Sequence, residues 1–249
     1  MQMFSVQDFC SHLTTKKIGH NVKYYDSIDS TNTEMSNMVS RNEINSFNMI
    51  ITDNQKNGRG RYGNQWISSQ FNSITCSIVI NNSIENLNTI LPLSCGIAIV
   101  EGIYKNSNIN CELKWPNDIM FNKKKIGGIL IEKKGDYFIV GLGLNVNQRT
   151  MDDIISKDSC SLRQIINKKI KREFLLADIL NALEKLITEP VRINIRKWEK
   201  LCYHINKNVS FSNGINKLTG VFLGLSDLGH AKMKIDNEIY TFNSGVIEL

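Results

Sequence analysis

The stretch Gln55–Trp66, QKNGRGRYGNQW, places three glycines and two arginines in one short run that ends at a tryptophan. Glycine lets backbone N–H groups approach a ligand closely, because it has no side chain. Arginine supplies a planar fork of donors that fits carboxylates and phosphates. The stretch therefore favours a loop that binds an anionic, phosphate-bearing ligand, although a flexible surface loop can have the same composition.

The glycines of this loop also match the GxGxxG pattern of dinucleotide-binding proteins, and the apolar run Phe47–Thr52 predicts a strand before them. That pattern requires a helix directly after the glycines, because the helix N-terminus holds the pyrophosphate. Here Asn64–Ser73 is polar and aromatic, and the apolar run Ile74–Ile80 predicts another strand. We therefore reject a dinucleotide-binding fold.

Three further clusters lie downstream of the loop. Lys114–Asp118, KWPND, is a proline turn with a lysine that can meet a phosphate and an aspartate that can hold Mg²⁺. Lys125–Glu132, KIGGILIE, predicts a strand that begins with a lysine, and the two glycines of this strand suggest close approach of a ligand or of another backbone segment. Gly141–Asn147, GLGLNVN, predicts a strand that passes a bulky group. Each cluster taken singly also has an ordinary structural explanation. KWPND fits a surface turn, Lys125 fits a solvated lysine at the end of a strand, and GLGLNVN fits a strand with a bulge.

The rest of the chain divides into a helix-containing part and a β-rich tail. Asp29–Asn32 is typical of a helix start, because these side chains accept hydrogen bonds from free N–H groups. Leu93–Tyr104 predicts a core helix, and Ser161–Lys200 is helical with a break at Pro190. We place a domain boundary near Lys200, giving domains 1–200 and 201–249. The tail predicts a small β-barrel from five short strands, at His204–Phe211, Lys217–Leu225, Ala231–Ile235, Ile239–Phe242 and Val246–Leu249.

Composition excludes several classes of protein. The 249 residues are 41% hydrophobic, which indicates a globular chain, and the net charge of +6 indicates loose attraction to anions. Six scattered cysteines without a CxxC pair argue against a disulfide framework or a zinc site. Residues 1–12 have no signal-peptide core, and we find no apolar run long enough to span a membrane. We expect a cytoplasmic protein with no membrane partner.

The order and spacing of the clusters resemble the biotin protein ligase family. The resemblance runs from about Tyr25 to the C-terminus and rests on Ser30–Asn32, GRGRYGNQW, KWPND, KIGGILIE and GLGLNVN. It implies an α/β (α+β) fold, with a mixed-sheet catalytic domain of the class II aminoacyl-tRNA synthetase type and a C-terminal SH3-like barrel. The barrel agrees with the β-rich tail.

The resemblance also implies an activity. The family activates biotin with ATP and Mg²⁺ to biotinyl-5′-AMP, and then transfers biotin to a lysine of a biotin carboxyl carrier protein, usually of acetyl-CoA carboxylase. By similarity, the biotin site comprises Ser30, Thr31, Asn32, Gln55, Arg59, Gly60, Arg61 and Lys125. The ATP and adenylate site comprises Gly58, Arg59, Arg61, Trp66, Lys114, Asn117, Asp118 and Asn145, with Asp118 facing the metal. The catalytic set is Arg59, Arg61, Lys114, Asp118 and Lys125.

Three alternatives and departures accompany this interpretation. A lipoate ligase shares the fold and chemistry, but the polar Ser-Thr-Asn and Gln set favours the ureido ring of biotin. A biotin-sensing regulator is disfavoured, because the first cluster begins by residue 30 and leaves little room for a DNA-binding domain, so we expect no specific DNA partner. Tyr62 and Asn64 replace arginines of many relatives, which weakens phosphate attraction. A homodimer through an edge strand at Tyr137–Val146 is a further expectation.

Overall fold

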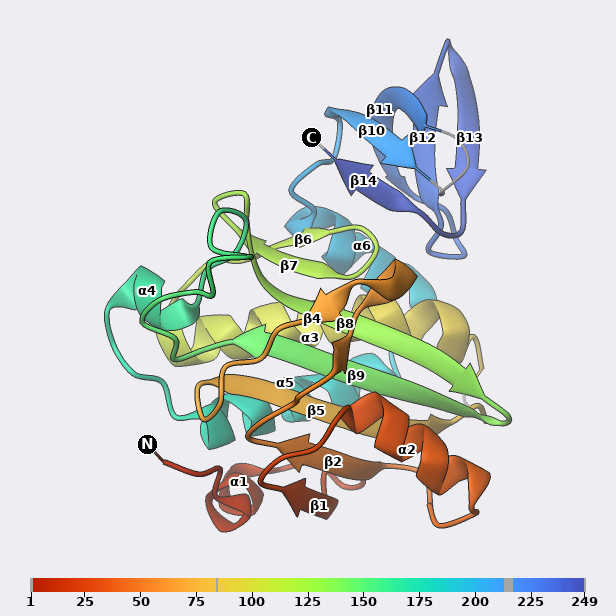
Figure 1. Ribbon diagram of the computed structural model, residues 1–249. Helices are drawn as coiled ribbons and strands as arrows, with labels where there is room; N and C mark the ends of the chain where they lie inside the picture. The colour runs from red at the N-terminus through yellow and green to blue at the C-terminus, as the bar shows by residue number, and fades with distance from the viewer. Residues whose placement is uncertain (1, 84, 213–216, 249) are drawn as a thin grey trace.

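The computed structural model describes residues 2–83, 85–212 and 217–248, and its centre is a mixed seven-stranded sheet (Figure 1). The outermost pair β1–β2 is parallel, and every other neighbouring pair is antiparallel. This arrangement confirms the predicted mixed sheet. In spatial order the strands are β1 (Asn21–Tyr25), β2 (Asn48–Thr52), β5 (Ser73–Asn81), β9 (Tyr137–Asn145), β8 (Lys124–Lys134), β7 (Asp118–Phe121) and β6 (Glu112–Lys114).

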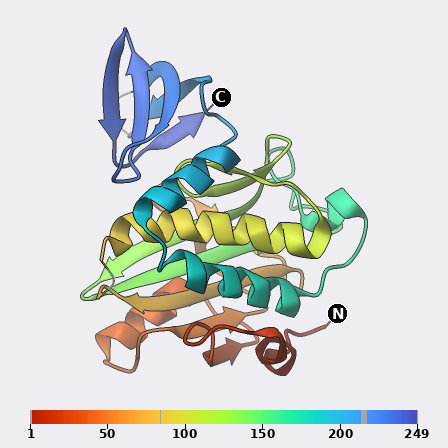
Figure 2. The ribbon, with the colours of Figure 1, turned by 180° about the vertical axis from the view of Figure 1, so that it is seen from behind.

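Helices cover the two faces of the sheet unequally. One face packs under α3 (Leu87–Ser107), α5 (Arg172–Leu186) and α6 (Val191–Leu201), as Figure 2 shows from behind. The short α1 (Val6–His12) lies on α5, and α4 (Leu162–Ile166) follows the central strands. The other face carries α2 (Thr31–Ser40), which leaves room beside it for a site.

Strand β5 shows how the sequence builds both faces. Because successive side chains of a strand point to opposite faces, Ile74, Cys76 and Ile78 enter the core under the helices. On the other face, Ser77 bonds to α2 through its hydroxyl. Further along that face a small cluster under α2 is apolar, and it contains Met35, Met38, Ile50, Val79 and Ile139. The strand is therefore buried from Ser73 to Ile80, yet one face carries hydroxyl groups near the N-terminus of α2.

The tail forms a second, antiparallel sheet that packs beside the first. Its strands are ordered β13 (Glu238–Phe242), β12 (Ala231–Ile235), β11 (Lys217–Leu225), β10 (Asn208–Ser212) and β14 (Val246–Glu248). The tail was expected to form a small SH3-like barrel; the sheet confirms a small β domain with β13 and β14 at its edges, and the closed barrel stays a prediction. Leu249 lies outside the described residues. Trp115 Nε1 donates to Gly229 O at 3.4 Å, and Leu225 N donates to Glu199 Oε1 at 2.8 Å. The boundary near Lys200 stays a prediction.

Two sequence expectations were wrong. The first concerns Tyr137–Val146, because β9 lies in the interior of the sheet and pairs along its length with β5 and β8. It therefore offers no edge for a homodimer.

The second wrong expectation is that no apolar segment is long enough to span a membrane. Helix α3 has 21 residues and is apolar enough to cross a membrane by length and composition. Within the protein, 78% of its apolar window is buried, as expected for a core helix.

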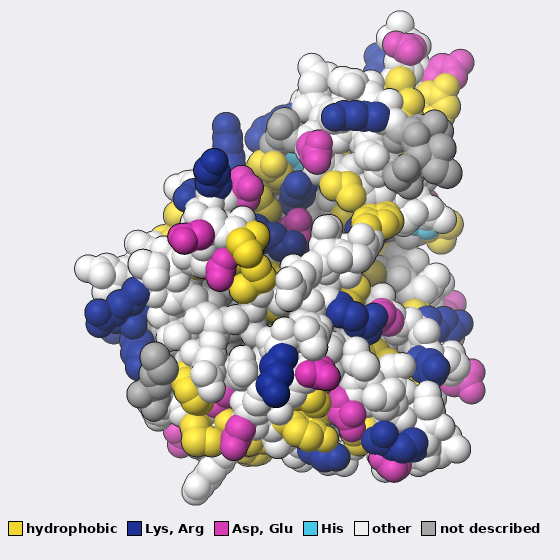
Figure 3. All heavy atoms as spheres, viewed as in Figure 1, with side chains coloured by type: hydrophobic (Ala, Val, Ile, Leu, Met, Phe, Trp, Pro, Cys, Tyr) yellow, Lys and Arg dark blue, Asp and Glu magenta, His cyan; other side chains and the backbone are white. Residues whose placement is uncertain are grey.

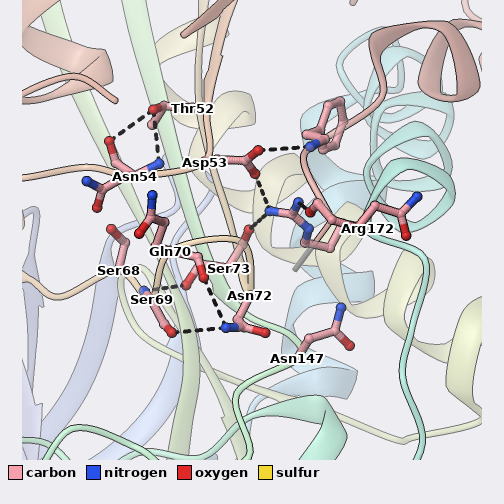
Figure 4. A network of polar contacts seen from close by, with 12 residues as sticks. Thr52, Asp53, Asn54, Ser68, Ser69, Gln70, Asn72, Ser73, Asn147 and Arg172 are labelled. Carbon is pink, nitrogen blue, oxygen red and sulfur yellow. Dashed lines mark hydrogen bonds and ion pairs between the residues drawn. The ribbon is translucent and has the colours of Figure 1, made fainter. Parts of the chain in front are cut away.

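A buried ion pair ties the N-terminal segment to the sheet and to α5 (Figure 4). Arg172 Nη1 lies 2.6 Å from Asp53 Oδ1, directly after β2. Phe4 N and Tyr24 Oη donate to the other carboxylate oxygen of Asp53 at 2.8 and 2.7 Å. Arg172 also donates to Ser73 O at 3.0 Å. The network fixes the chain two residues before Gln55, where the Gly/Arg loop begins.

Candidate active site

A cavity that is partly open to solvent lies on the face of the sheet that carries α2. Three segments from distant parts of the sequence enclose it: the N-terminus of α2, the loop 55–66 and the turn 114–118. Strands β5, β8 and β9 form its floor, and Val246 of the second sheet lies at its rim. The predicted residues on its walls are Ser30, Thr31, Asn32, Gln55, Arg59, Gly60, Arg61, Trp66, Lys114, Asn117, Asp118 and Lys125.

The N-terminus of α2 forms a polar wall. Ser30 caps the helix, because its hydroxyl accepts from Thr33 N at 3.3 Å. Gln55 Oε1 accepts from Thr31 N at 2.9 Å and lies 3.2 Å from Thr31 Oγ1. All three side chains are buried, so their polar groups are fixed by one another rather than by water. The predicted helix start therefore presents a rigid set of donors and acceptors to the cavity.

Two glycines of β9 allow bulky groups to lie directly on the strand. A Cβ atom at Gly141 would overlap the side-chain amide of Asn32, and one at Gly143 would overlap the indole of Trp66. This confirms the prediction that the strand passes something bulky. The indole Nε1 of Trp66 is buried without a hydrogen-bond partner among the described residues. Because such donors are rarely left unpaired, this atom is available to a ligand.

The Gly/Arg loop is a small hairpin. Strand β3 (Gly58–Arg59) pairs with β4 (Gln65–Trp66), and a 3-10 turn at Arg61–Gly63 joins them. Tyr62 within the turn has a left-handed φ of 55°. No helix follows the glycines, so the rejection of a dinucleotide-binding fold is confirmed.

The two arginines of the hairpin point to different partners. Arg59 Nη2 donates to Glu132 Oε2 at 2.8 Å, and its side chain remains 46% exposed. Arg61 donates at 3.2 Å to the O atom of Gly245, the residue before β14 of the second sheet, and at 3.4 Å to Asn117 Oδ1. Arg61 thereby joins the hairpin to the KWPND turn and to the second sheet.

The KWPND turn brings Asp118 opposite Lys125. Lys125 Nζ lies 2.6 Å from Asp118 Oδ1, with the side chains 34% and 22% exposed. Asn117 Nδ2 donates to Ile129 O at 2.8 Å, which holds the turn against β8. Behind the turn, burial, with Lys114 and Lys207 nearby, lowers the pKa of His204 to about 3, so this histidine is neutral. The ion pair therefore faces the cavity on a turn that is fixed from behind.

The charge of the cavity favours an anion. Its walls carry four cations, Arg59, Arg61, Lys114 and Lys125, against one carboxylate, Asp118. Figure 3 shows Lys and Arg side chains in the hollow between the two sheets, with acidic side chains among them. The described residues contain no group of three metal-ligating side chains. A magnesium ion fits only as one held by Asp118 together with ligand phosphates and water, which is a common arrangement for Mg²⁺.

Two predicted site residues do not line the cavity. Gly58 lies in the hairpin ladder, where a Cβ would overlap Trp66 O. Asn145 is buried and its Oδ1 accepts from Gln148 Nε2 at 3.0 Å. Sequence reasoning missed Thr75, whose buried hydroxyl lines the cavity without a partner among the described residues. The alternation along Ile74–Ile80 could have indicated it, because Thr75 and Ser77 share a face.

Comparisons with known proteins agree on one family. Residues 24–147 match the Biotin/lipoate A/B protein ligase family. The bifunctional ligase/repressor BirA of Bacillus spizizenii is 30% identical over 252 residues, covering 95% of this chain and 76% of the relative. The biotin–[acetyl-CoA-carboxylase] ligase of Mycobacterium tuberculosis is 27% identical over 147 residues, covering 57% of this chain and 54% of the relative.

A solved structure gives the same result in three dimensions. The biotin protein ligase from Aquifex aeolicus, in complex with biotin and ATP, superposes with a TM-score of 0.81 and 30% sequence identity. The match covers 92% of this chain and 98% of that structure. It therefore includes both sheets. On this agreement of fold, motifs and sequence, the chain belongs to the biotin/lipoate A/B protein ligase family, among its biotin protein ligases.

Proposed function

We propose that this protein activates biotin with ATP to biotinyl-5′-AMP and transfers the biotin to a lysine of a biotin carboxyl carrier protein. The observation that carries the proposal is a single cavity in which the polar wall of Ser30, Thr31 and Asn32 lies together with four cations. The wall suits a polar ring, and the cations suit a carboxylate and phosphates. A lipoate ligase is the second candidate, but lipoate has no ureido group to pair with this wall.

Adenylation brings two anions together. An oxygen of the biotin carboxylate attacks the α-phosphorus of ATP, and the bond to the bridging oxygen of pyrophosphate breaks. Lys125 and Lys114 offset the repulsion between carboxylate and phosphate, and Arg59 and Arg61 cover the phosphates from the hairpin. Most of the remaining acceleration comes from holding the two reactants in position.

A divalent cation belongs to this step. Asp118 is the carboxylate among the cavity-lining residues, so it is the residue that would hold Mg²⁺ together with the ligand's phosphates. When bound, the ion supplies further charge neutralisation at the transferred phosphoryl group. Lys125, which lies 2.6 Å from Asp118 Oδ1, would bind the carboxylate of biotin.

Transfer completes the reaction. The neutral amine of the carrier lysine attacks the mixed anhydride carbonyl, an amide bond forms, and AMP leaves. The hairpin closes over the adenylate until the carrier arrives, because the anhydride reacts with water and other amines. The acceptor is the carrier domain of acetyl-CoA carboxylase or a related carboxylase.

Two further properties accompany the proposal. We propose a cytoplasmic location, which suits six free cysteines. We also propose that the chain recognises no specific DNA sequence. A tight, salt-tolerant preference for one DNA sequence would contradict this, because non-specific binding weakens steeply with salt.

The decisive experiment separates the two ligands. The purified protein is incubated with ATP and Mg²⁺ and with either biotin or lipoate, and the adenylate is detected by mass spectrometry. We expect biotinyl-AMP with biotin and no adenylate with lipoate. If adenylate forms with lipoate and not with biotin, the protein is a lipoate ligase, the second candidate. A reaction without Mg²⁺ tests whether the cation is required.

A further inference from the structure

Glu132 lies near the C-terminal end of β8 and contacts two parts of the site. Its Oε2 accepts from Arg59 Nη2 and from Asn32 Nδ2, each at 2.8 Å. One carboxylate oxygen therefore joins the hairpin to the polar wall. The side chain is 33% exposed and is not one of the residues that line the cavity, so it acts from behind Asn32.

A chain of hydrogen bonds leads inward from Glu132. Asn32 Oδ1 accepts from Ser77 Oγ at 2.6 Å, and Ser77 Oγ lies 2.7 Å from Thr31 Oγ1. Thr31 in turn contacts Gln55 Oε1. Thr31, Asn32 and Gln55 face the cavity, and Ser77 is buried beneath them.

The carboxylate sets the direction of this chain. An ionised carboxylate only accepts hydrogen bonds, so Asn32 must present its amide nitrogen to Glu132 and its oxygen to Ser77. A hydroxyl has one proton, so a Ser77 that donates to Asn32 must accept from Thr31. Asn32 Nδ2 also donates to Leu130 O, at the longer distance of 3.4 Å. Without the charge on Glu132, the orientation of the Asn32 amide depends mainly on this longer contact, so the pattern of donors and acceptors along the wall is held less firmly.

We infer that Glu132 is a positioning residue that fixes the amide of Asn32 for recognition of the polar ring of biotin and anchors the empty hairpin through Arg59. The role in biotin recognition rests on the proposed function, whereas the anchoring of the hairpin does not depend on it. Both effects follow from one oxygen atom, so one substitution alters both.

The first test is a double-mutant cycle on biotin affinity, measured by calorimetry without ATP. Glu132→Gln keeps the shape and removes the charge, and we expect about tenfold weaker binding, the effect of one charge-assisted hydrogen bond. Asn32→Ala weakens binding as well. The double variant should bind within about threefold of Asn32→Ala, because Glu132 then has no amide to orient. Additive losses would overturn the inference.

The second test needs no ligand. Trypsin cleaves after Arg59 and Arg61, and the rate reports how firmly the hairpin is held. We expect Glu132→Gln to be cleaved several-fold faster than the unmodified protein. The matched control is Glu43→Gln, which removes a similar pair with Arg41 at 2.9 Å, far from the hairpin. It should leave both biotin affinity and cleavage unchanged.

The two tests separate the inference from the proposed function. If the unmodified protein binds no biotin, the proposed function fails, while the cleavage rates still decide whether Glu132 anchors the hairpin. Cleavage of Glu132→Gln at the rate of the unmodified protein overturns the anchoring, and normal biotin affinity in that variant overturns the orientation of Asn32.

Discussion

Two ion pairs of equal length occupy very different surroundings. Arg172 and Asp53 approach to 2.6 Å, and so do Lys125 and Asp118. The first pair is buried, with side chains 5% and 0% exposed, and the second is open, with side chains 34% and 22% exposed. Distance alone would rank them as equivalent, so the difference must come from what else each charged group contacts.

The buried pair uses its remaining polar atoms on the protein. Arg172 also donates to Ser73 O (Figure 4). In addition, Asp53 accepts from Phe4 N and Tyr24 Oη, and Arg172 donates to Gln2 O. For the cavity pair, the described part of the chain gives neither the side chain of Lys125 nor that of Asp118 a second polar partner. The pair of Asp53 and Arg172 is saturated, meaning that both of its side chains make further hydrogen bonds within the protein, and such a pair supports the fold. The pair of Lys125 and Asp118 is open, meaning that its polar atoms have unused hydrogen-bonding capacity, which a ligand in the cavity can use.

The largest expected effect concerns the saturated pair. Asp53→Ala leaves the guanidinium of Arg172 buried without its partner, which costs about 3–5 kcal/mol of unfolding free energy. Urea unfolding followed by circular dichroism measures the loss. Asp118→Ala should change stability by less than about 1 kcal/mol, because its pair is partly solvated. Equal losses for the two variants would refute the distinction between the pairs.

The next effect concerns the open pair. Asp118→Ala should slow biotinyl-AMP synthesis by roughly 10²–10³-fold, the typical cost of losing one electrostatic group at a reacting centre. The measurement is pyrophosphate release at saturating biotin and ATP. Asp136→Ala, at the exposed turn of the β8–β9 hairpin, is the matched control and should retain full activity. A normal rate for Asp118→Ala would remove this residue from the metal and phosphate site.

Local sequence patterns predicted the elements well and the long-range pairs poorly. The cap at Ser30, the apolar run Ile74–Ile80 and the break at Pro190 all depend on neighbouring residues, so they could be seen in the sequence. The pair of Asp53 and Arg172 spans 119 residues, and no periodicity relates the two positions. Such pairs arise only when the sheet and α5 come together.

The same limit applies within the site. The motifs placed Arg59, Asp118 and Lys125 in one cavity through a family resemblance, not through spacing. Glu132 is the last residue of the KIGGILIE motif, but its contact with Asn32 depends on how α2 lies over β9. The carbonyl of Gly245 carries no side-chain signal at all, and only the packing of the second sheet brings it to Arg61.

A smaller effect is expected at the other end of the open pair. Lys125→Ala removes a charge-assisted hydrogen bond to the carboxylate of biotin, worth about 1.5–3 kcal/mol, or one to two decades in affinity. ATP affinity should fall less, because three other cations of the cavity remain. Calorimetric titration with each ligand measures the two affinities. Unchanged biotin affinity would show that Lys125 serves only to hold Asp118.

The smallest effect on synthesis is expected at Arg61, which acts on the hairpin rather than on the ion pair. Arg61→Gly removes the donors to Gly245 O and Asn117 Oδ1, and it adds a glycine that increases the freedom of the open hairpin. Adenylate should still form, since Lys114, Asp118 and Lys125 remain. The intermediate should leave sooner, because the hairpin is no longer tied to the second sheet.

Released adenylate acylates any nearby amine, which gives a direct measurement for this last variant. Arg61→Gly, Arg61→Lys and the unmodified protein are each mixed with biotin, ATP and an unrelated lysine-rich protein, and biotin on that protein is quantified by blotting. We expect the most labelling with Arg61→Gly and an intermediate level with Arg61→Lys, which keeps the charge but loses the planar fork. Equal labelling by all three, with adenylate synthesis verified, would show that retention depends on other contacts of the hairpin, foremost the pair of Arg59 and Glu132.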